Sequence, residues 1–248
     1  MPYPILAYHN VAPMPRLALN RRLYLAPWRF ALQMRTLAAL GYRGVSLREG
    51  LPYLAGNKSG RIVILTFDDG YRDTLTHALP VLRRFGFSAT CFLVAAELGR
   101  YNRWDTVHWE VRKALMNPGD VERWLAAGMD IGSHTLNHPY LTRISGAEQL
   151  LKIERSKRML EATFSRPIEH FCYPYGDFDA DCVRAVRASG YVSAVTTKRG
   201  FASAPDDLHT LKRICVNGER GWLRFVLQIT TGYENLRGAK VNREAAVY

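Results

Sequence analysis

The segment Ile62-Val63-Ile64-Leu65-Thr66-Phe67-Asp68-Asp69-Gly70 is an apolar run that ends in two carboxylates and a glycine. Such a run of β-branched and aliphatic residues predicts a strand, here Ile62–Thr66, that is buried on both faces. An Asp-Asp-Gly sequence by itself is an ordinary turn. Directly after a buried parallel strand, however, both acids would lie at the carboxyl end of a sheet, where the active sites of α/β proteins assemble.

Similar short apolar runs recur along the chain and alternate with stretches of helical spacing. This alternation predicts βα units, a mostly parallel sheet and the α/β fold class. The chain has no linker rich in Ser, Gly or Pro and no obvious repeat, so one domain over residues 1–248 is expected, with a motif core at about 60–200. The predicted strands are Ile5–Tyr8, Arg43–Ser46, Ile62–Thr66, Ala89–Val94, Met129–Gly132, His170–Tyr173, Val192–Thr196 and Arg213–Val216.

Helices are predicted between these strands, at Pro27–Leu40, Tyr71–Phe85, Ser145–Thr163 and Asp179–Ser189. Ser145 and Glu148 form the sequence pattern of a capping box. The irregular stretch 97–120, which contains Trp104 and Trp109, is expected to be an insertion over one rim. The tail 219–237 has the pattern of one amphipathic helix, for which core packing is favoured over membrane contact.

Positive charge is concentrated at the two ends of the chain. There are 34 Lys and Arg against 22 Asp and Glu among 248 residues, a net charge of +12. Residues 1–60 carry eight basic side chains and one acid, and residues 208–248 carry seven basic and three acidic ones. These basic flanks would suit an anionic membrane or a phosphorylated substrate, although an inert basic surface is favoured on charge alone. No nucleic-acid-binding motif accompanies the charge, so no nucleic acid is expected.

The sequence also bears on cellular location. No apolar run approaches the length of about 18 residues that a membrane span requires, and the first residues lack the pattern of a signal peptide. A cytoplasmic protein, with peripheral contact at the inner membrane as a further expectation, is therefore predicted. The four cysteines show no C-x-x-C spacing, which favours buried thiols over a zinc ribbon or a disulfide framework.

Polar clusters directly follow several of the predicted strands. They are Thr66–Gly70, Gly132–Pro139 and Tyr173–Asp177, with a weaker fourth cluster at Tyr8–Asn10. In a parallel sheet these positions would converge on one cleft. A His-x-x-x-His pair such as His134 and His138 is common by chance, but residues at i and i+4 can face one metal ion.

Two imidazoles and one carboxylate would leave a divalent metal with open positions for water and substrate. A bound metal lowers the pKa of water and polarises a carbonyl, and a second carboxylate can take the proton of the water as general base. The adjacent acids Asp68 and Asp69 would point in different directions, so that one could bind the metal and the other face the water. The combination predicts a hydrolase.

Thr66–Gly70, His134–Pro139 and Tyr173–Gly176, in this order, resemble the polysaccharide deacetylase family, which is carbohydrate esterase family 4 or the NodB-homology domain. The resemblance implies a deformed (β/α) barrel that removes N-acetyl or O-acetyl groups from glycans. It also implies a divalent metal, usually Zn²⁺ and sometimes Co²⁺ or Ni²⁺. The Tyr8-His9 opening and Phe171-x-Tyr-Pro-Tyr-Gly176 are similar to the branch that acts on poly-N-acetylglucosamine.

Carried over residue by residue, the resemblance implies that Asp68 is the general base and that Asp69, His134 and His138 are the metal ligands. The backbone N–H of Tyr175 would help to stabilise the oxyanion. The substrate is expected to contact Tyr173, Pro174 and Trp104.

Two positions depart from the family pattern. Many members carry an Arg that orients the base at the position of Cys172, and the sequence does not show what replaces it. The family also has a late Leu-x-His as general acid, which Asp207-Leu208-His209 does not match. His9 is the preferred acid because its strand end should face the same cleft, whereas His209 is expected to precede a strand.

The predicted function is removal of N-acetyl, or O-acetyl, groups from a glycan or glycan precursor. A lipid-linked or nucleotide-linked sugar is the expected substrate, because its phosphates would suit the basic flanks. The alternatives are a deformylase or another amide hydrolase, a non-haem iron oxygenase with the same ligand set, and a non-catalytic module that binds glycans or polyanions. The extra carboxylate of Asp68 argues against the oxygenase, which needs no such base.

Overall fold

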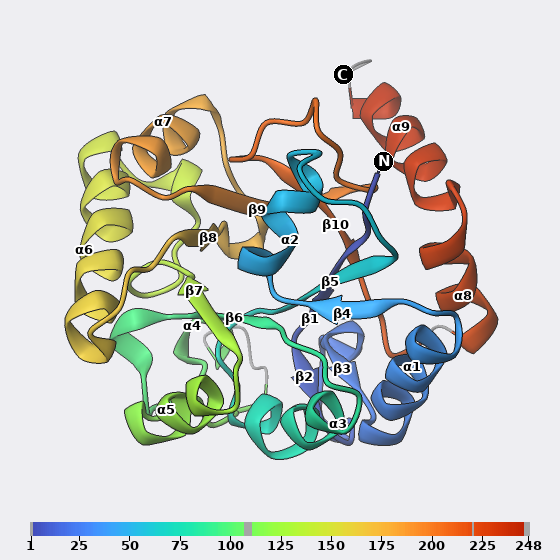
Figure 1. Cartoon of the computed structure of the whole chain (residues 1–248). Coiled ribbons are helices and arrows are strands. Elements are labelled where there is room, and N and C mark those ends of the chain that lie inside the picture. Colours follow the sequence, from blue (N-terminus) through green and yellow to red (C-terminus); the bar gives the residue numbers. More distant parts are fainter. Residues whose placement is uncertain (1, 107–110, 220, 246–248) are drawn as a thin grey trace.

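The computed structural model describes residues 2–106, 111–219 and 221–245. Parallel strands form its centre, and seven of them close into a ring in the order β1-β10-β9-β8-β7-β6-β5, with β5 pairing back onto β1 (Figure 1). This ring confirms the predicted α/β class and the deformed barrel. The strands of the main sheet are β1 (Ile5–Tyr8), β4 (Arg43–Val45), β5 (Ile62–Phe67), β6 (Thr90–Leu93), β7 (Asp130–Ser133), β8 (His170–Cys172), β9 (Ser193–Arg199) and β10 (Leu211–Cys215).

The deformation of the barrel lies at β5. Ile64 pairs with both Ile5 of β1 and Val45 of β4, whereas Thr66 pairs with β1 and with Thr90 of β6. The strands β4 and β6 therefore share one edge of β5, β4 along its first half and β6 along its second. Because β6 takes over this edge, β4 stays outside the closed ring.

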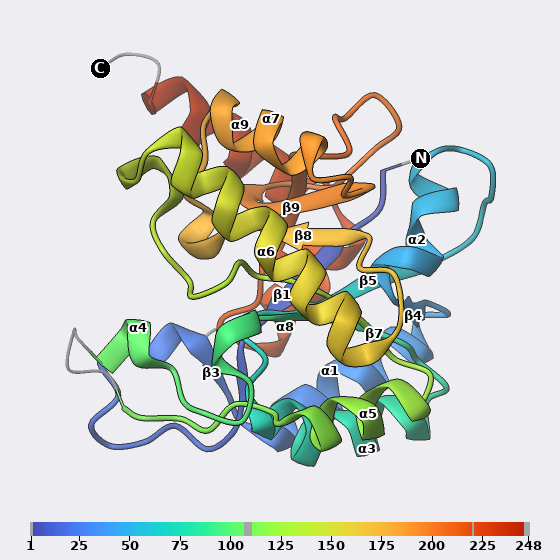
Figure 2. The ribbon, with the colours of Figure 1, turned by 90° about the vertical axis from the view of Figure 1, so that its left-hand side faces the viewer.

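Helices surround the barrel (Figures 1 and 2). The long helix α6 begins after the predicted capping box of Ser145 and Glu148, which the structure confirms. The helices are α1 (Pro27–Ala39), α2 (Leu47–Leu54), α3 (Leu79–Arg84), α4 (Arg103–Thr106), α5 (Pro118–Ala126), α6 (Gly146–Phe164), α7 (Ala180–Ala188), α8 (Trp222–Thr230) and α9 (Tyr233–Ala245). Two short strands, β2 (Asn10–Val11) and β3 (Tyr24–Leu25), pair beside the barrel.

Several helix predictions need correction. The stretch Tyr71–Phe85 is a π-helical turn at Thr74–Ala78 followed by α3, because Pro80 has no N–H to continue the α-helical hydrogen bonds. The tail 219–237 is two helices, since Thr231 has an extended backbone between α8 and α9. Helix α2, which tolerates Pro52 within it, and helix α5 were not predicted from the sequence.

Helix α8 packs Phe225 and Ile229 into the core, as the tail was predicted to do, while Trp222 and Leu223 stay exposed. Among the described residues, no helix is long and apolar enough to span a membrane. Three of the cysteines are buried as predicted, but Cys215 is exposed.

A buried histidine near the start of β8 predicts how stability depends on pH. His170 is fully buried, and burial together with the charges of Arg48 and Lys157 lowers its pKa to about 3. Below the ordinary histidine pKa of about 6.5, this residue is protonated in the unfolded chain but stays neutral in the folded chain. This contribution therefore lowers the free energy of unfolding by about 1 kcal/mol per pH unit as the pH falls from 6 to 4.

The variant His170→Gln should lose this contribution, so that its unfolding free energy falls less steeply with pH than that of the wild type. Urea unfolding at pH 4.5, 5.5 and 6.5 measures both slopes. Equal slopes would contradict a neutral His170 in the folded protein.

Candidate active site

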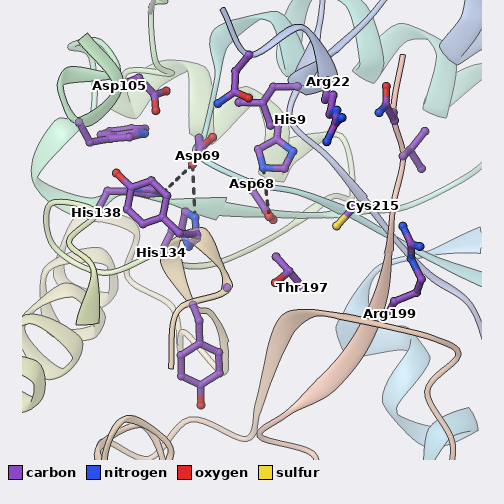
Figure 3. A pocket seen from close by; sticks show the side chains of 18 residues that line it. His9, Arg22, Asp68, Asp69, Asp105, His134, His138, Thr197, Arg199 and Cys215 are labelled. Carbon is purple, nitrogen blue, oxygen red and sulfur yellow. Dashed lines mark ion pairs between the residues drawn. The ribbon is translucent and has the colours of Figure 1, made fainter. Parts of the chain in front are cut away.

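The carboxyl ends of β1, β5, β7, β9 and β10 and the turn after β8 surround one cavity of about 360 Å³ (Figure 3). The predicted residues His9, Asp68, Asp69, His134 and His138 all line it. Segments that are far apart in the sequence therefore meet at the edge where the polar clusters were expected to converge.

Asp69 lies between the two histidines. Its Oδ1 is 3.4 Å from Nε2 of His134 and 3.2 Å from Nε2 of His138, and all three side chains are buried. Two imidazole nitrogens and a carboxylate oxygen in a buried site are a donor set that fits a divalent transition metal.

The His-x-x-x-His pair does not lie on a helix. It occupies the turn after β7, where Thr135 and His138 have left-handed backbone angles, with φ of 66° and 57°. The Thr135 hydroxyl accepts a hydrogen bond from the His138 N–H at 3.0 Å. A turn with positive φ angles therefore brings the two rings together, and the i, i+4 spacing serves here without a helix.

Neighbouring groups set the orientation and charge of the two rings. Nδ1 of His134 lies 2.7 Å from the carbonyl oxygen of Cys172, which leaves Nε2 directed at Asp69. Burial lowers the pKa of His138 to about 4, so this ring is neutral near pH 7 and keeps a lone pair for a metal. Burial would raise the pKa of Asp69, but the two histidines beside its carboxylate hold that pKa well below its usual range.

Arg213 holds the neighbouring carboxylate. Its Nη1 and Nη2 donate to Oδ1 and Oδ2 of Asp68, both at 2.7 Å, and its Nε donates to the Thr196 carbonyl oxygen at 2.8 Å. Nη2 also lies 3.2 Å from Sγ of Cys172. The third motif lacks an arginine at Cys172, and Arg213 from β10 contacts Asp68 in its place. The guanidinium passes beside the small Cys172 side chain.

Arg213 was not predicted as a site residue, and appeared only as the start of a predicted strand. One signal was present in the sequence: Leu211, Arg213 and Cys215 alternate along one face of a short strand, so an arginine is placed on a face that also carries apolar side chains. Burial would raise the pKa of Asp68, but the charge and hydrogen bonds of Arg213 hold it below its ordinary value.

His9 lies on the open side of Asp68. Its Nε2 is 3.8 Å from Oδ2 of Asp68, and its side chain is 22% exposed (Figure 3). His209 is not among the residues that line the cavity, and its Nε2 lies 2.9 Å from the carbonyl oxygen of Tyr191. Of the two histidines considered as general acid, the structure brings only His9 to the base.

The third motif forms a tight turn at the cavity wall. Tyr175 has a φ of 60°, and the hydrogen bonds of the turn run from the Gly176 N–H to Tyr173 and from the Asp177 N–H to Pro174. These bonds do not use the Tyr175 N–H. A Cβ at Gly176 would come within 1.9 Å of Thr197 Oγ1, so only glycine fits here.

Aromatic rings line the side of the cavity that carries His134 and His138. Trp104 stacks on His138 with ring centroids 4.6 Å apart, and the Tyr175 ring meets the edge of His138 at 4.4 Å. Tyr173 also lines the cavity, although its hydroxyl donates to the His209 carbonyl oxygen. The structure does not bring Pro174 into the cavity, because this residue is buried beneath the turn. Trp109 lies outside the described residues.

The cavity also contains residues that the sequence analysis did not single out as part of the site. Burial and the nearby Asp69 raise the pKa of Asp105 to about 6, against hydrogen bonds from Asn102 and Tyr71. Arg22 and Arg199 lie on the other side of the cavity. No motif marks these three residues: Asp105 lies in the short helix α4, Arg22 in the turn before β3, and Arg199 at the far end of β9.

Comparison with known proteins agrees with this geometry. A family model described as polysaccharide deacetylase matches residues 55–194. The chain belongs to the polysaccharide deacetylase family. The resemblance inferred from Thr66–Gly70, His134–Pro139 and Tyr173–Gly176 is therefore confirmed.

Curated relatives of this deacetylase family include YxkH of Bacillus subtilis (strain 168), which is 27% identical over 216 residues, 86% of this chain and 71% of YxkH. The poly-beta-1,6-N-acetyl-D-glucosamine N-deacetylase of Staphylococcus epidermidis is 23% identical over 77% of this chain and 67% of that protein. The peptidoglycan-N-acetylglucosamine deacetylase PgdA of Listeria monocytogenes is 31% identical over 43% of this chain. The chain matches 20% of the length of PgdA.

Solved structures show the same barrel. The Streptococcus pyogenes deacetylase PplD, in complex with acetate, superposes with a TM-score of 0.80 at 26% identity, covering 92% of this chain and 98% of PplD. IcaB from Ammonifex degensii has a TM-score of 0.73 at 24% identity, covering 88% of this chain and 93% of IcaB. The deformed barrel predicted from the sequence is thus the fold of these proteins.

Proposed function

We propose that this polysaccharide deacetylase hydrolyses the N-acetyl group of a glycan or glycan precursor in a metal-dependent reaction. The observation that carries the proposal is the separation of two adjacent carboxylates. Asp69 lies between two imidazoles, whereas Asp68 is held by a guanidinium. Asp69 is thereby suited to bind a metal, and Asp68 is suited to accept a proton.

Asp69, His134 and His138 would hold the metal, and Zn²⁺ is the expected ion, with Co²⁺ and Ni²⁺ as alternatives. When bound, such a metal polarises the acyl carbonyl and makes water more acidic. The buried position of all three side chains keeps the donors in place before substrate arrives.

The remaining chemistry belongs to residues of the chain. Asp68 accepts a proton from the attacking water, and the bidentate contact with Arg213 keeps it ionised and aimed. The N–H of Tyr175 donates to the oxyanion as the carbonyl carbon becomes tetrahedral. His9 then protonates the sugar nitrogen as the C–N bond breaks, so that one amide and one water yield acetate and an amine.

Metal removal tests the proposal directly. Wild-type protein should contain one divalent metal per chain and release acetate from oligomers of N-acetylglucosamine. Chelation should abolish this release, and added Zn²⁺, Co²⁺ or Ni²⁺ should restore it. Elemental analysis and an acetate assay measure both properties. Formate release from an N-formyl sugar, with no acetate release from the N-acetyl oligomers, would instead identify a deformylase.

The variant His138→Gln should lose metal affinity at least 10-fold together with activity, since it removes one of three donors. His209→Gln is the matched control, because His209 lies outside the cavity lining. Metal-independent acetate release, or equal metal content in both variants, would overturn the assigned ligands.

A further inference from the structure

The cavity has a second side, opposite Asp69 and the two histidines (Figure 3). Hydrogen-bond donors gather there. Arg22 comes from the turn before β3, Thr197 and Arg199 come from β9, and Asn217 follows β10. None of these residues has a part in the hydrolysis described above, so their placement requires another explanation.

Arg199 is held in position by a buried carboxylate on α9. Its Nε lies 2.8 Å from Oε2 of Glu234 on α9, and Gln228 on α8 donates to Oε1 of the same carboxylate at 2.8 Å. Glu234 is fully buried, whereas the Arg199 side chain is 26% exposed. The carboxylate contact fixes one edge of the guanidinium, and the Arg199 side chain lines the cavity on the same side as Cys215 (Figure 3). An arginine has five N–H donors, so several remain for a ligand.

Arg22 adds a positive charge to this side of the cavity. The side chain is exposed at the cavity, and it forms no ion pair with any residue in the described ranges. Glu234 balances the charge of Arg199, so Arg22 makes this side of the cavity net positive. The opposite side carries Asp69 and Asp105. The cavity is therefore polarised from one wall to the other.

We propose that Arg22 and Arg199 bind an anionic group of the substrate, a carboxylate or a phosphate, near the sugar whose acetamido group reaches Asp68. This inference rests on the proposed deacetylase function and specifies its substrate class. A fixed guanidinium suits these planar or tetrahedral anions, which accept two of its hydrogen bonds at once. A neutral poly-N-acetylglucosamine would leave the positive charge of Arg22 without a partner. The preferred substrate is accordingly an acidic or phosphorylated acetylated sugar.

Three substrates with the same reacting group test this inference. They are a trimer of N-acetylglucosamine, the same trimer carrying a 6-phosphate, and an oligomer that alternates N-acetylglucosamine with N-acetylmuramic acid. Acetate release yields kcat/KM for each, at low and high salt. Wild-type protein should prefer one of the anionic substrates to the neutral trimer by at least 10-fold at low salt, mainly through KM, and the preferred anion distinguishes phosphate from carboxylate.

In Arg199→Gln and in Arg22→Gln, this preference should fall about 10- to 100-fold, the range for a lost charged hydrogen bond. Arg155→Gln, which removes one exposed positive charge from α6, is the matched control and should keep the preference unchanged. Near-ultraviolet circular dichroism verifies that every variant is folded.

The results separate this inference from the function on which it rests. Acetate release from all three substrates with equal kcat/KM, dependent on Asp68, would overturn the anion site and leave the deacetylase intact. Equal losses of activity on neutral and anionic substrates in the arginine variants would also overturn the anion site alone. Failure of the metal-loaded wild type to release acetate from any of them would overturn both.

Discussion

Asp68→Asn abolishes acetate release but leaves the metal content of the protein unchanged: this is the result that the geometry predicts. The amide cannot accept the proton of the attacking water, and loss of a general base lowers kcat by about 10²- to 10⁴-fold. The proposed ligands Asp69, His134 and His138 are untouched, so stoichiometric metal should remain. Acetate assays and elemental analysis on the same preparation measure both outcomes.

The buried arginine makes a stability measurement necessary in this experiment. The amide of Asp68→Asn would keep one oxygen for Arg213 but lack the negative charge, so the variant should also unfold more easily, by about 1–3 kcal/mol. Urea unfolding shows whether the inactive sample is folded. Asp181→Asn, at an exposed acid on α7, is the matched control and should retain activity and stability. Acetate release above a tenth of the wild-type rate by folded Asp68→Asn would exclude Asp68 as the base.

The strands of the barrel could be predicted from the sequence because each is a short apolar run, and a buried parallel strand has that pattern on both faces. The polar clusters that follow these strands could be placed at one edge of the sheet, because the carboxyl ends of parallel strands lie at the same edge. Closure of the ring was implied by the family resemblance and not by the strand pattern, since it depends on β1 pairing with both β5 and β10, and strand pairing between distant segments leaves no local pattern.

The contact between Arg213 and Asp68 could not be predicted either, because it also joins distant segments of the chain. Arg213 and Asp68 are 145 residues apart in the sequence, and only the closed barrel brings them together. The cluster with His134 and His138 was predicted to follow a strand, but the conformation of its turn was not predicted, because positive φ angles at Thr135 and His138 cannot be deduced from those residue types. The fold class and the candidate metal-ligating residues can thus be predicted from local sequence patterns. The identity of Arg213 as the group that orients Asp68 depends on tertiary structure.

Arg213→Met should impair both stability and catalysis, and the two effects have separate signatures. Arg213 and Asp68 are both buried, so the variant leaves a buried carboxylate without its countercharge, which costs about 3–5 kcal/mol of unfolding free energy. Lys212→Met, at the preceding residue of β10 with a partly exposed side chain, is the matched control and should lose far less. Urea unfolding at pH 7 measures both values.

The catalytic effect of Arg213→Met should be strongest at low pH. Burial raises the pKa of Asp68 and Arg213 lowers it, so without the arginine the carboxylate gains its proton at a higher pH. Because the base acts when ionised, the acidic limb of the plot of kcat/KM against pH should move to higher pH. Arg213→Lys keeps a positive charge but loses the bidentate contact, so its acidic limb should lie between those of the wild type and Arg213→Met. A uniform loss at every pH, with an unmoved limb, would mean that Arg213 supports the fold without tuning the base.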